Sequence, residues 1–180
     1  MPDPPATQTA IITQSDTKLG ISHNAPVPDL EPTMVLIKNV AVPLNPTDYK
    51  MPAYFPSPGA INGCDFTGTI IAMGSAVKRA LKVGDRVCGA VHGANPIRHQ
   101  SGTFAEYVEA DPDFIIKVPK DMAWEAAAAI GGAVIGTVGL GLFHSLGLPG
   151  PEKPANKAFV VLVYGGSTAC GTMAIQLLKL

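Results

Sequence analysis

The residues that follow Phe159 have the types and spacing that suit a phosphate ligand. A continuous apolar run, Phe159–Tyr164, leads into small residues and then into a helical pattern. Such a run is typical of a strand buried on both faces of a parallel sheet. Small residues in the turn allow backbone amides to approach a pyrophosphate at the positive end of the following helix. We therefore predict a strand, a cofactor-binding loop and a helix, with contacts from Gly165, Gly166, Ser167, Thr168, Ala169 and Cys170.

The spacing in this loop departs from the G-x-G-x-x-G template, because Gly165, Thr168 and Gly171 give G-x-x-T-x-x-G. A buried strand that turns tightly into a helix without a ligand is the alternative. In such folds the residue that reads the ribose lies roughly twenty residues farther on, and the sequence ends before it, at Leu180. We therefore expect part of an enzyme, in which the open-edged strand Phe159–Tyr164 pairs with a second copy or a complementary chain.

The composition is that of a globular protein without an excess of either charge. The chain has 13 Lys and Arg against 14 Asp and Glu, and 47% of its residues are hydrophobic. No Lys/Arg cluster occurs along the sequence, which argues against nucleic acid and membranes as partners. No uninterrupted apolar stretch reaches the roughly twenty residues of a membrane span, and no signal peptide is apparent, so we expect a cytoplasmic protein. Cys64, Cys88 and Cys170 form no C-x-x-C pair and are expected to be reduced thiols.

Short β-prone segments separated by proline and glycine fill the first two thirds of the chain. They are Thr9–Thr13, Val35–Val42, Gly68–Met73, Arg86–Ala90 and Phe104–Val108. Many short strands at such spacing indicate a barrel or a strongly bent sheet.

Two helices are predicted next, one from a cap at Asp121 through residues 124–129 and one over residues 133–146. Leu148–Pro154 contains three prolines and is expected to be a stiff connector. We thus predict a β-rich domain over residues 1–120, a helical connector with a linker over 121–158, and the start of a dinucleotide-binding α/β domain over 159–180.

Five short motifs follow one another along the chain. They are Pro43–Lys50 (PLNPTDYK), Gly63–Gly68 (GCDFTG), Val83–Val87 (VGDRV), Gly102–Tyr107 (GTFAEY) and the Gly165 loop. In this order they resemble the medium-chain dehydrogenase/reductase superfamily. The wording NPTDYKM, GDRVCGA and LVYGGSTA is most similar to the trans-acting enoyl reductases of fungal polyketide synthases, of the lovastatin-pathway type.

This resemblance implies a fold, a cofactor and a partner. The implied fold is a GroES-like barrel followed by helices and by the first β-α unit of a Rossmann-type domain. NADPH is the implied cofactor, and a polyketide synthase that presents a carrier-bound acyl chain is the implied partner. The reaction would be hydride transfer from the nicotinamide to the β-carbon of an α,β-unsaturated thioester, followed by protonation at the α-carbon.

A metal is not expected. The zinc-dependent branch of the superfamily places a metal-binding cysteine where Asn45 stands and a histidine where Cys64 stands. Cys64 and Asp65 alone cannot supply the three protein ligands of a catalytic zinc. Another spacing, C-x3-H-x6-H, is expected to belong to a loop near the pocket rather than to a metal site; it comprises Cys88, His92 and His99.

The resemblance makes Lys50 and Thr137 the implied catalytic residues. Lys50 would bind the ribose or phosphate of the cofactor, or polarise the thioester carbonyl, and an exposed surface lysine is the alternative. Thr47, Asp48 and Tyr49 are implied cofactor contacts, although Asn-Pro-Thr-Asp is also a good turn sequence.

Further roles follow from the same resemblance. Thr137 would lie close to the nicotinamide, and its alternative is a hydroxyl that bonds back to a carbonyl one turn earlier. Ser167 and Thr168 resemble a hydroxyl pair that is offered to phosphate oxygens, and Asp65 is expected to pair with backbone amides or with Arg86. Eight residues would line the acyl pocket, or else simply form an apolar packing helix: Val138, Gly139, Leu140, Gly141, Leu142, Phe143, His144 and Ser145.

Two other functions remain open at this point. One is a zinc-free quinone reductase, which would accept free quinones instead of carrier-bound thioesters. The other is a non-catalytic remnant or binding module that keeps an acyl pocket but holds no dinucleotide.

Overall fold

The computed structural model describes residues 4–16, 18–150, 152 and 154–180. They form two compact units, Met1–Gly132 and Ala133–Leu180.

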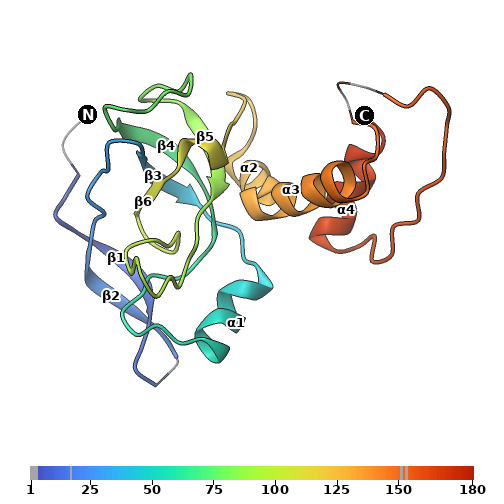
Figure 1. Ribbon diagram of the computed structural model, residues 1–180. Coiled ribbons are helices and arrows are strands. Elements are labelled where there is room, and N and C mark those ends of the chain that lie inside the picture. Colours follow the sequence, from blue (N-terminus) through green and yellow to red (C-terminus); the bar gives the residue numbers. More distant parts are fainter. Residues whose placement is uncertain (1–3, 17, 151, 153) are drawn as a thin grey trace. The chain divides into compact units, whose positions relative to one another are not determined.

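The first unit is built from two antiparallel sheets (Figure 1). In the smaller sheet β1 (Thr7–Thr13) pairs with β2 (Leu19–Pro26), and in the larger sheet the order is β6-β3-β4-β5-β7. The strands of the larger sheet are β3 (Val35–Ala41), β4 (Asp65–Met73), β5 (Arg86–Ala90), β6 (Tyr107–Ala110) and β7 (Ile115–Lys117). Isolated bridges from β1 to Ile61 and to Ala105 tie the smaller sheet to the rest. The predicted β-rich fold is confirmed.

All five predicted strands are present, with ends that shift by a few residues. The largest shift is that of Phe104–Val108, where the structure has β6 at Tyr107–Ala110. Strands β2 and β7 were not predicted from the sequence. β2 ends in Asn-Ala-Pro and is largely exposed, and β7 has only three residues, which is too short for a periodic pattern to be recognised.

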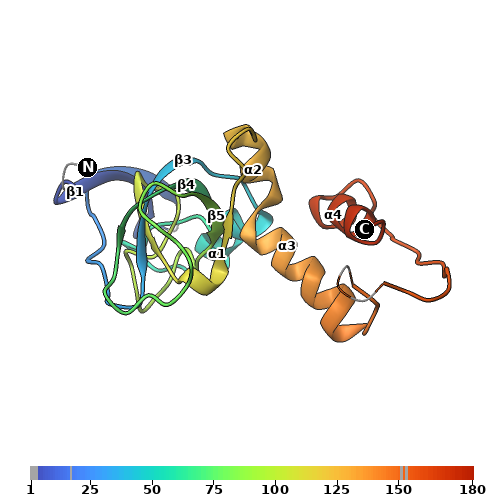
Figure 2. The same ribbon diagram turned by 90° about the horizontal axis from the view of Figure 1, so that it is seen from above.

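Apolar side chains from all five strands of the larger sheet form its hydrophobic core. They are Val35, Ile37, Phe66, Ile70, Val87, Val108, Ala110 and Ile115. Helix α2 (Trp124–Ile130) covers one side, where Ala127 packs with Cys88 and Val118 (Figure 2). Its N-cap is Ala123, so the predicted cap at Asp121 is wrong. This core fixes the end of β3 and the start of β4, between which the chain forms α1 (Pro46–Tyr54).

The second unit is helical. Helix α3 (Gly132–Gly139) starts at the last residue of the first unit and continues into a π-helical segment, η2 (Leu140–Ser145), whose wider turn is closed by a 3.0 Å bond from the Leu146 N–H to the Gly141 carbonyl. Apolar side chains of this helix pack on α4 (Ala169–Leu177); the buried ones are Val138, Leu142 and Ala174. The predicted helix over residues 133–146 is confirmed.

One helical run among the described residues, Trp124–Ser145, is long and apolar enough to cross a membrane by length and composition alone. Core helices of soluble proteins pass the same test.

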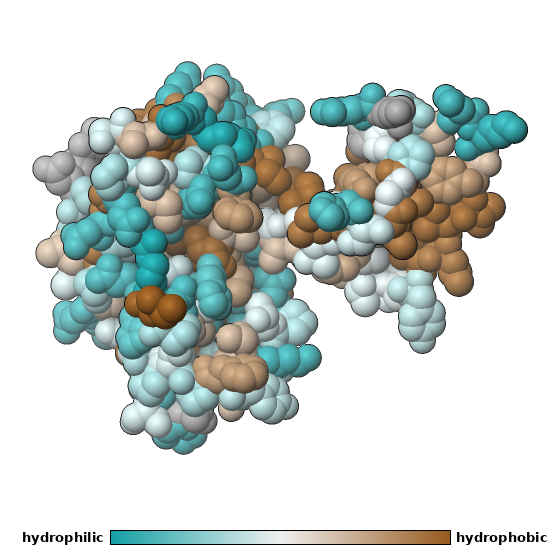
Figure 3. Space-filling view, in the orientation of Figure 1, coloured by the Kyte–Doolittle hydropathy of each residue, from teal (hydrophilic) through white to brown (hydrophobic). Residues whose placement is uncertain are grey.

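The predicted strand Phe159–Tyr164 is wrong. The described residues of this segment form no strand, and Val160, Leu162 and Tyr164 are 97%, 90% and 100% exposed. A strand is held by hydrogen bonds to neighbouring strands, and none of the described strands pairs with this segment. Figure 3 shows the exposed hydrophobic residues of the second unit in brown. The helix predicted after the loop is confirmed as α4.

Candidate functional site

Helix α1 begins at the Asn-Pro-Thr-Asp sequence that also reads as a turn. Pro46 occupies the first helical position, where its missing N–H costs nothing. The Asn45 backbone N–H donates to Asp48 Oδ2 at 2.7 Å, which is one half of a capping box. Asp48 is 4% exposed. Its carboxylate therefore closes the start of the helix.

A proline inside α1 is compensated by a side chain from the loop before β4. Pro52 has no N–H, so the carbonyl four residues earlier, that of Asp48, loses its helical donor. The Asn62 side-chain amide donates to this carbonyl oxygen. Asn62 is 1% exposed, so a buried amide replaces the missing backbone bond.

A second buried contact ties α1 to the large sheet. Asn45 Nδ2 donates to Asp65 Oδ2 at 2.9 Å, and Asp65, the first residue of β4, is fully buried. The Arg86 guanidinium, one of the partners expected for Asp65, donates instead to the carbonyls of Pro119, Lys120 and Met122. Asn45, which by the resemblance stands where zinc-dependent relatives carry a cysteine, here ties the start of α1 to β4.

Lys50 lies on the outer side of the anchored helix. Its Nζ is 5.9 Å from the centre of the Tyr49 ring, and the side chain is exposed. Lys50 forms no ion pair within the described part of the chain. Asp48, two residues earlier, faces inward, and Thr47 is half-buried. The network around Asp48 thus fixes the backbone while the Lys50 ammonium stays available for a ligand.

The thiol beside this network is not poised to react. Burial and the nearby carboxylates of Asp48 and Asp65 raise the pKa of Cys64 to about 11. Burial also raises the pKa of Cys88 to about 11. Thiols with such pKa values are protonated at neutral pH and are poor nucleophiles and metal ligands. The described residues contain no group of three or more His, Cys, Asp or Glu that could hold a metal ion.

The structure of the loop before α4 accounts for the unusual spacing of Gly165, Thr168 and Gly171. Gly165 has a φ of +81°, which favours glycine. The Thr168 hydroxyl donates to the Gly165 carbonyl at 2.8 Å and accepts from the Gly171 N–H at 3.0 Å. A Cβ on Gly171 would lie 2.1 Å from the Gly165 carbonyl oxygen. The G-x-x-T-x-x-G pattern is therefore a packing unit, in which Thr168 caps the helix.

Other cofactor candidates in this loop are exposed. Ser167, Ala169 and Cys170 are exposed, and Gly166 is half-buried. Both hydroxyls of the predicted pair are on exposed residues, but the hydroxyl proton of Thr168 is already donated to the Gly165 carbonyl, which leaves Ser167 as the candidate donor to a phosphate.

Thr137 and the eight residues after it lie on one helix of the second unit. Thr137 is exposed and its hydroxyl makes no hydrogen bond within the described part of the chain, so the alternative of a hydroxyl bonded to an earlier carbonyl is not realised. Val138 and Leu142 are 6% and 8% exposed because they pack with Ala174. The remaining predicted substrate residues are half-buried or exposed: Gly139, Leu140, Gly141, Phe143, His144 and Ser145.

A cavity of about 950 Å³ opens elsewhere in the first unit and is lined by His92 and His99. Its wall carries Arg98, which lies 3.0 Å from a carboxylate oxygen of Glu31 and 2.5 Å from one of Glu109. Burial raises the pKa of Glu109. The two predicted loop histidines thus belong to a cavity, whereas Cys88 lies in the core beneath α2.

Comparison with known proteins identifies the class. The alcohol dehydrogenase GroES-like domain family matches residues 31–120, and the chain belongs to this family. An alcohol dehydrogenase superfamily protein from Novosphingobium aromaticivorans superimposes with a TM-score of 0.80 at 27% identity, over 96% of this chain and 50% of that one. A quinone oxidoreductase from Coxiella burnetii gives a TM-score of 0.66 at 28% identity, over 96% and 53%. The medium-chain dehydrogenase/reductase resemblance is confirmed.

Curated relatives are more similar still. Trans-enoyl reductase ccsC of Aspergillus clavatus is 53% identical, over 98% of this chain and 50% of the relative. Trans-enoyl reductase ffsC of Aspergillus flavipes is 51% identical, over 98% and 49%. The chain spans about half the length of the curated relatives that it matches.

Two contacts that hold α1 were not predicted from the sequence: the Asn62 amide on the Asp48 carbonyl, and Asn45 as the residue that caps the helix and binds Asp65. Asn45 could have been found, because an Asn followed by Pro and, three residues on, by Asp is a helix-start signature. Asn62 could not have been found, since no sequence pattern around it indicates a partner fourteen residues earlier.

Proposed function

We propose that the protein is a trans-acting enoyl reductase, which reduces an α,β-unsaturated polyketide thioester with a hydride from NADPH. The observation that carries this proposal is Lys50, which is exposed and forms no ion pair with a described residue, on a helix whose start is capped by Asn45 and Asp48. It occurs in a chain about half of whose residues are identical to those of proteins named trans-enoyl reductases.

The loop before α4 fits a dinucleotide phosphate. Gly165 turns the chain with a positive φ, and the backbone N–H groups of Ala169 and Cys170 lie in the first turn of α4, where helix N–H groups have no helical acceptor. Ser167 adds an exposed hydroxyl. A structure of a mycobacterial protein complexed with NADPH, 25% identical with a TM-score of 0.72, supports NADPH as the cofactor. It covers 94% of this chain and 49% of that one.

NADPH, when bound, supplies the hydride. Addition at the β-carbon places negative charge on the thioester oxygen, and a donor aimed at that oxygen stabilises the transition state. The Lys50 ammonium is the proposed donor, with binding of the ribose or phosphate as its second role. Thr47 and Tyr49 are the proposed neighbours of the cofactor. Asp48 acts by holding the helix that carries Lys50.

Thr137 is proposed as the second catalytic residue, because its hydroxyl is exposed and makes no hydrogen bond of its own in the described chain. The exposed residues of the following helix, Leu140, His144 and Ser145, are proposed acyl contacts. Val138 and Leu142 support this surface from the core beneath it.

A polyketide synthase that delivers a carrier-bound acyl chain is the proposed partner, and the cytoplasm is the proposed compartment. The names of the fungal relatives, which are trans-enoyl reductases, support the proposal of a separate partner.

The test measures NADPH binding and oxidation with purified protein. Calorimetric titration should give micromolar binding, and NADPH should be consumed only when an enoyl thioester of N-acetylcysteamine is added. NADPH oxidation is also measured with menadione, a free quinone, because a quinone oxidoreductase is among the similar structures. Faster oxidation with menadione than with the thioester would favour a quinone reductase, and absence of NADPH binding would favour a non-catalytic module.

A further inference from the structure

Cationic residues that are scattered along the sequence gather at one end of the first unit. They come from two segments, residues 78–86 and 117–120, and β5 and β7 bring these together, with Val87 paired to Lys117. Six of the 13 Lys and Arg residues lie here: Lys78, Arg79, Lys82, Arg86, Lys117 and Lys120. No Lys/Arg cluster occurs along the sequence, and these cations gather only in the folded chain.

Only part of this charge is neutralised. Lys117 Nζ lies 2.9 Å from Asp85 Oδ2, and Arg79 lies 3.6 Å from a carboxylate oxygen of Asp113. The Arg86 guanidinium is turned toward backbone carbonyls and stacks on a tryptophan ring, 3.9 Å from its centre.

Three lysines remain. Lys78, Lys82 and Lys120 are exposed and form no ion pair with any described residue, although the charge of Lys82 helps to lower the pKa of Asp85 and the exposed carboxylate of Asp121 follows Lys120 in sequence. The surface therefore keeps a positive excess.

Exposed apolar side chains lie among these cations. Phe114 and Val83 are 66% and 47% exposed. Val83 follows Lys82 in the turn before β5, and Phe114, which also lines the cavity with His92 and His99, follows Asp113, the partner of Arg79. We call this surface the basic face, defined by the two apolar residues together with Lys78, Arg79, Lys82, Lys117 and Lys120. Apolar anchors inside a charged rim are the usual anatomy of a protein–protein interface.

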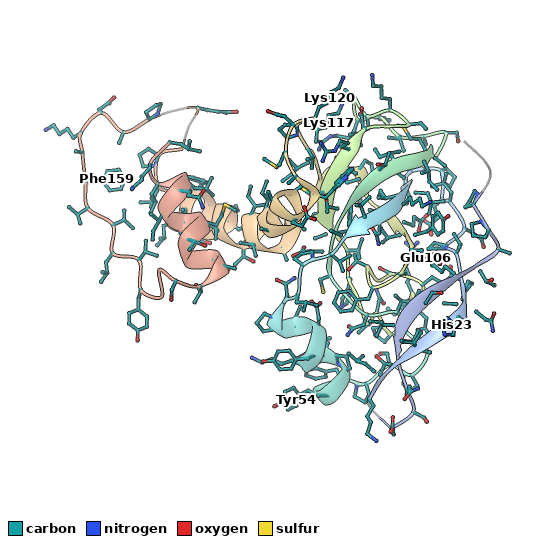
Figure 4. All side chains as sticks on the ribbon, turned by 180° about the vertical axis from the view of Figure 1, so that it is seen from behind. His23, Tyr54, Glu106, Lys117, Lys120 and Phe159 are labelled. Carbon is teal, nitrogen blue, oxygen red and sulfur yellow. The ribbon has the colours of Figure 1, made fainter. Side chains whose placement is uncertain are left out.

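The basic face lies away from α1. Figure 4 shows Lys117 and Lys120 at the end of the first unit opposite Tyr54, which is the last residue of α1. In Figure 3 hydrophilic residues cover the end of this unit where the β4–β5 connection lies. A partner bound there would leave Lys50 uncovered.

We propose that the basic face binds an acidic surface of the synthase that delivers the acyl chain, an inference that rests on the proposed function. Complementary charge would speed encounter and fix orientation. A protein fits this surface better than nucleic acid does, because Asp85 and Asp113 interrupt the row of cations and would repel phosphates, and because Phe114 needs an apolar contact.

The test uses an isolated carrier domain of a fungal reducing polyketide synthase as the probe. Its affinity for the protein is measured by calorimetry at low and high salt. The variant reverses the three unpaired lysines, by Lys78→Glu, Lys82→Glu and Lys120→Glu. The matched control reverses three cations outside the basic face, by Lys18→Glu, Lys38→Glu and Lys157→Glu.

The basic-face variant should bind the carrier domain about tenfold more weakly, and the control should stay within about twofold. Unchanged affinity in the basic-face variant, or no binding by the wild type, would overturn the proposal. So would tighter binding of duplex DNA or anionic vesicles that is lost in the same variant.

Reduction of the free N-acetylcysteamine thioester separates this inference from the proposed function. The basic-face variant should reduce the free thioester at the wild-type rate, because no residue of the face belongs to the proposed site. A wild type that binds the carrier domain through the face but reduces no thioester would refute the proposed function and leave this inference standing.

Discussion

The side-chain amide of Asn62 donates to the backbone carbonyl of Asp48, the acceptor that Pro52 leaves without a helical N–H. Replacing Asn62 by Ala removes this donor and leaves a buried carbonyl unpaired. The free energy of unfolding should fall by about 1–3 kcal/mol. Urea denaturation followed by circular dichroism measures the change. Asn24→Ala, at an exposed position of β2, is the control and should have little effect; an equal loss in both variants would argue against the Asn62 contact.

Two glycines of the second unit should respond in opposite directions to alanine. In Gly171→Ala the new Cβ would lie 2.1 Å from the Gly165 carbonyl oxygen, so the loop must shift and the unit lose stability. In Gly136→Ala, on α3, the Cβ meets nothing within 4 Å, and helix propensity should add about 1 kcal/mol. Thermal unfolding of the two variants side by side gives the comparison. A stabilised Gly171→Ala variant would show that the loop is not packed as described.

Thiol reactivity should differ between the cysteines. Because the pKa of Cys64 is raised to about 11, only about one Cys64 thiol in a thousand is ionised at pH 8, whereas Cys170 is exposed. Iodoacetamide at pH 8, followed by peptide mass spectrometry, should label Cys170 first and leave Cys64 and Cys88 largely unmodified. Rapid labelling of Cys64 in the folded protein would contradict its burial beside Asp48 and Asp65.

The ion pair at Asp85 should make stability depend on acid pH. The hydrogen bond from Lys117 lowers the pKa of Asp85 below its usual 3.8. A lowered pKa in the folded state adds stability that is fully present above the unfolded-state pKa and is lost as the pH falls through the folded one. The wild type should therefore be more stable than Asp85→Asn above about pH 5, and the difference should shrink below about pH 4. Chemical denaturation across this range tests the sign; a difference that grows toward low pH would refute it.

Local patterns were enough to predict much of the fold. The five strands from Thr9 to Val108 and the helices at residues 124–129 and 133–146 follow from apolar runs bounded by glycine and proline. The prediction of a strand at Phe159–Tyr164 failed for a physical reason, since an apolar run forms a strand only where neighbouring strands supply hydrogen bonds. Helix α1 was not predicted, because Asn-Pro-Thr-Asp suits both a turn and a helix cap.

The parts of the site that could not be predicted depend on contacts between distant segments. Asn62 and Asp65 reach α1 only after β4 has joined the sheet. The basic face likewise exists only because β5 pairs with β7. Thr168 was expected at the phosphate, but its hydroxyl proton is given to Gly165, a detail of loop geometry that spacing does not reveal.

The most direct test of the proposed function is the steady-state rate of NADPH oxidation by Lys50→Ala with an enoyl thioester of N-acetylcysteamine. Lys50 is exposed and forms no ion pair with a described residue, so the Lys50→Ala variant should melt at the wild-type temperature. The rate should fall by about a hundredfold or more, as expected when a donor to a developing oxyanion is removed. A fall in kcat points to the thioester oxygen, and a rise in the KM for NADPH points to the cofactor. A stable Lys50→Ala protein with the wild-type rate and KM would contradict the role of Lys50 and the site built around it.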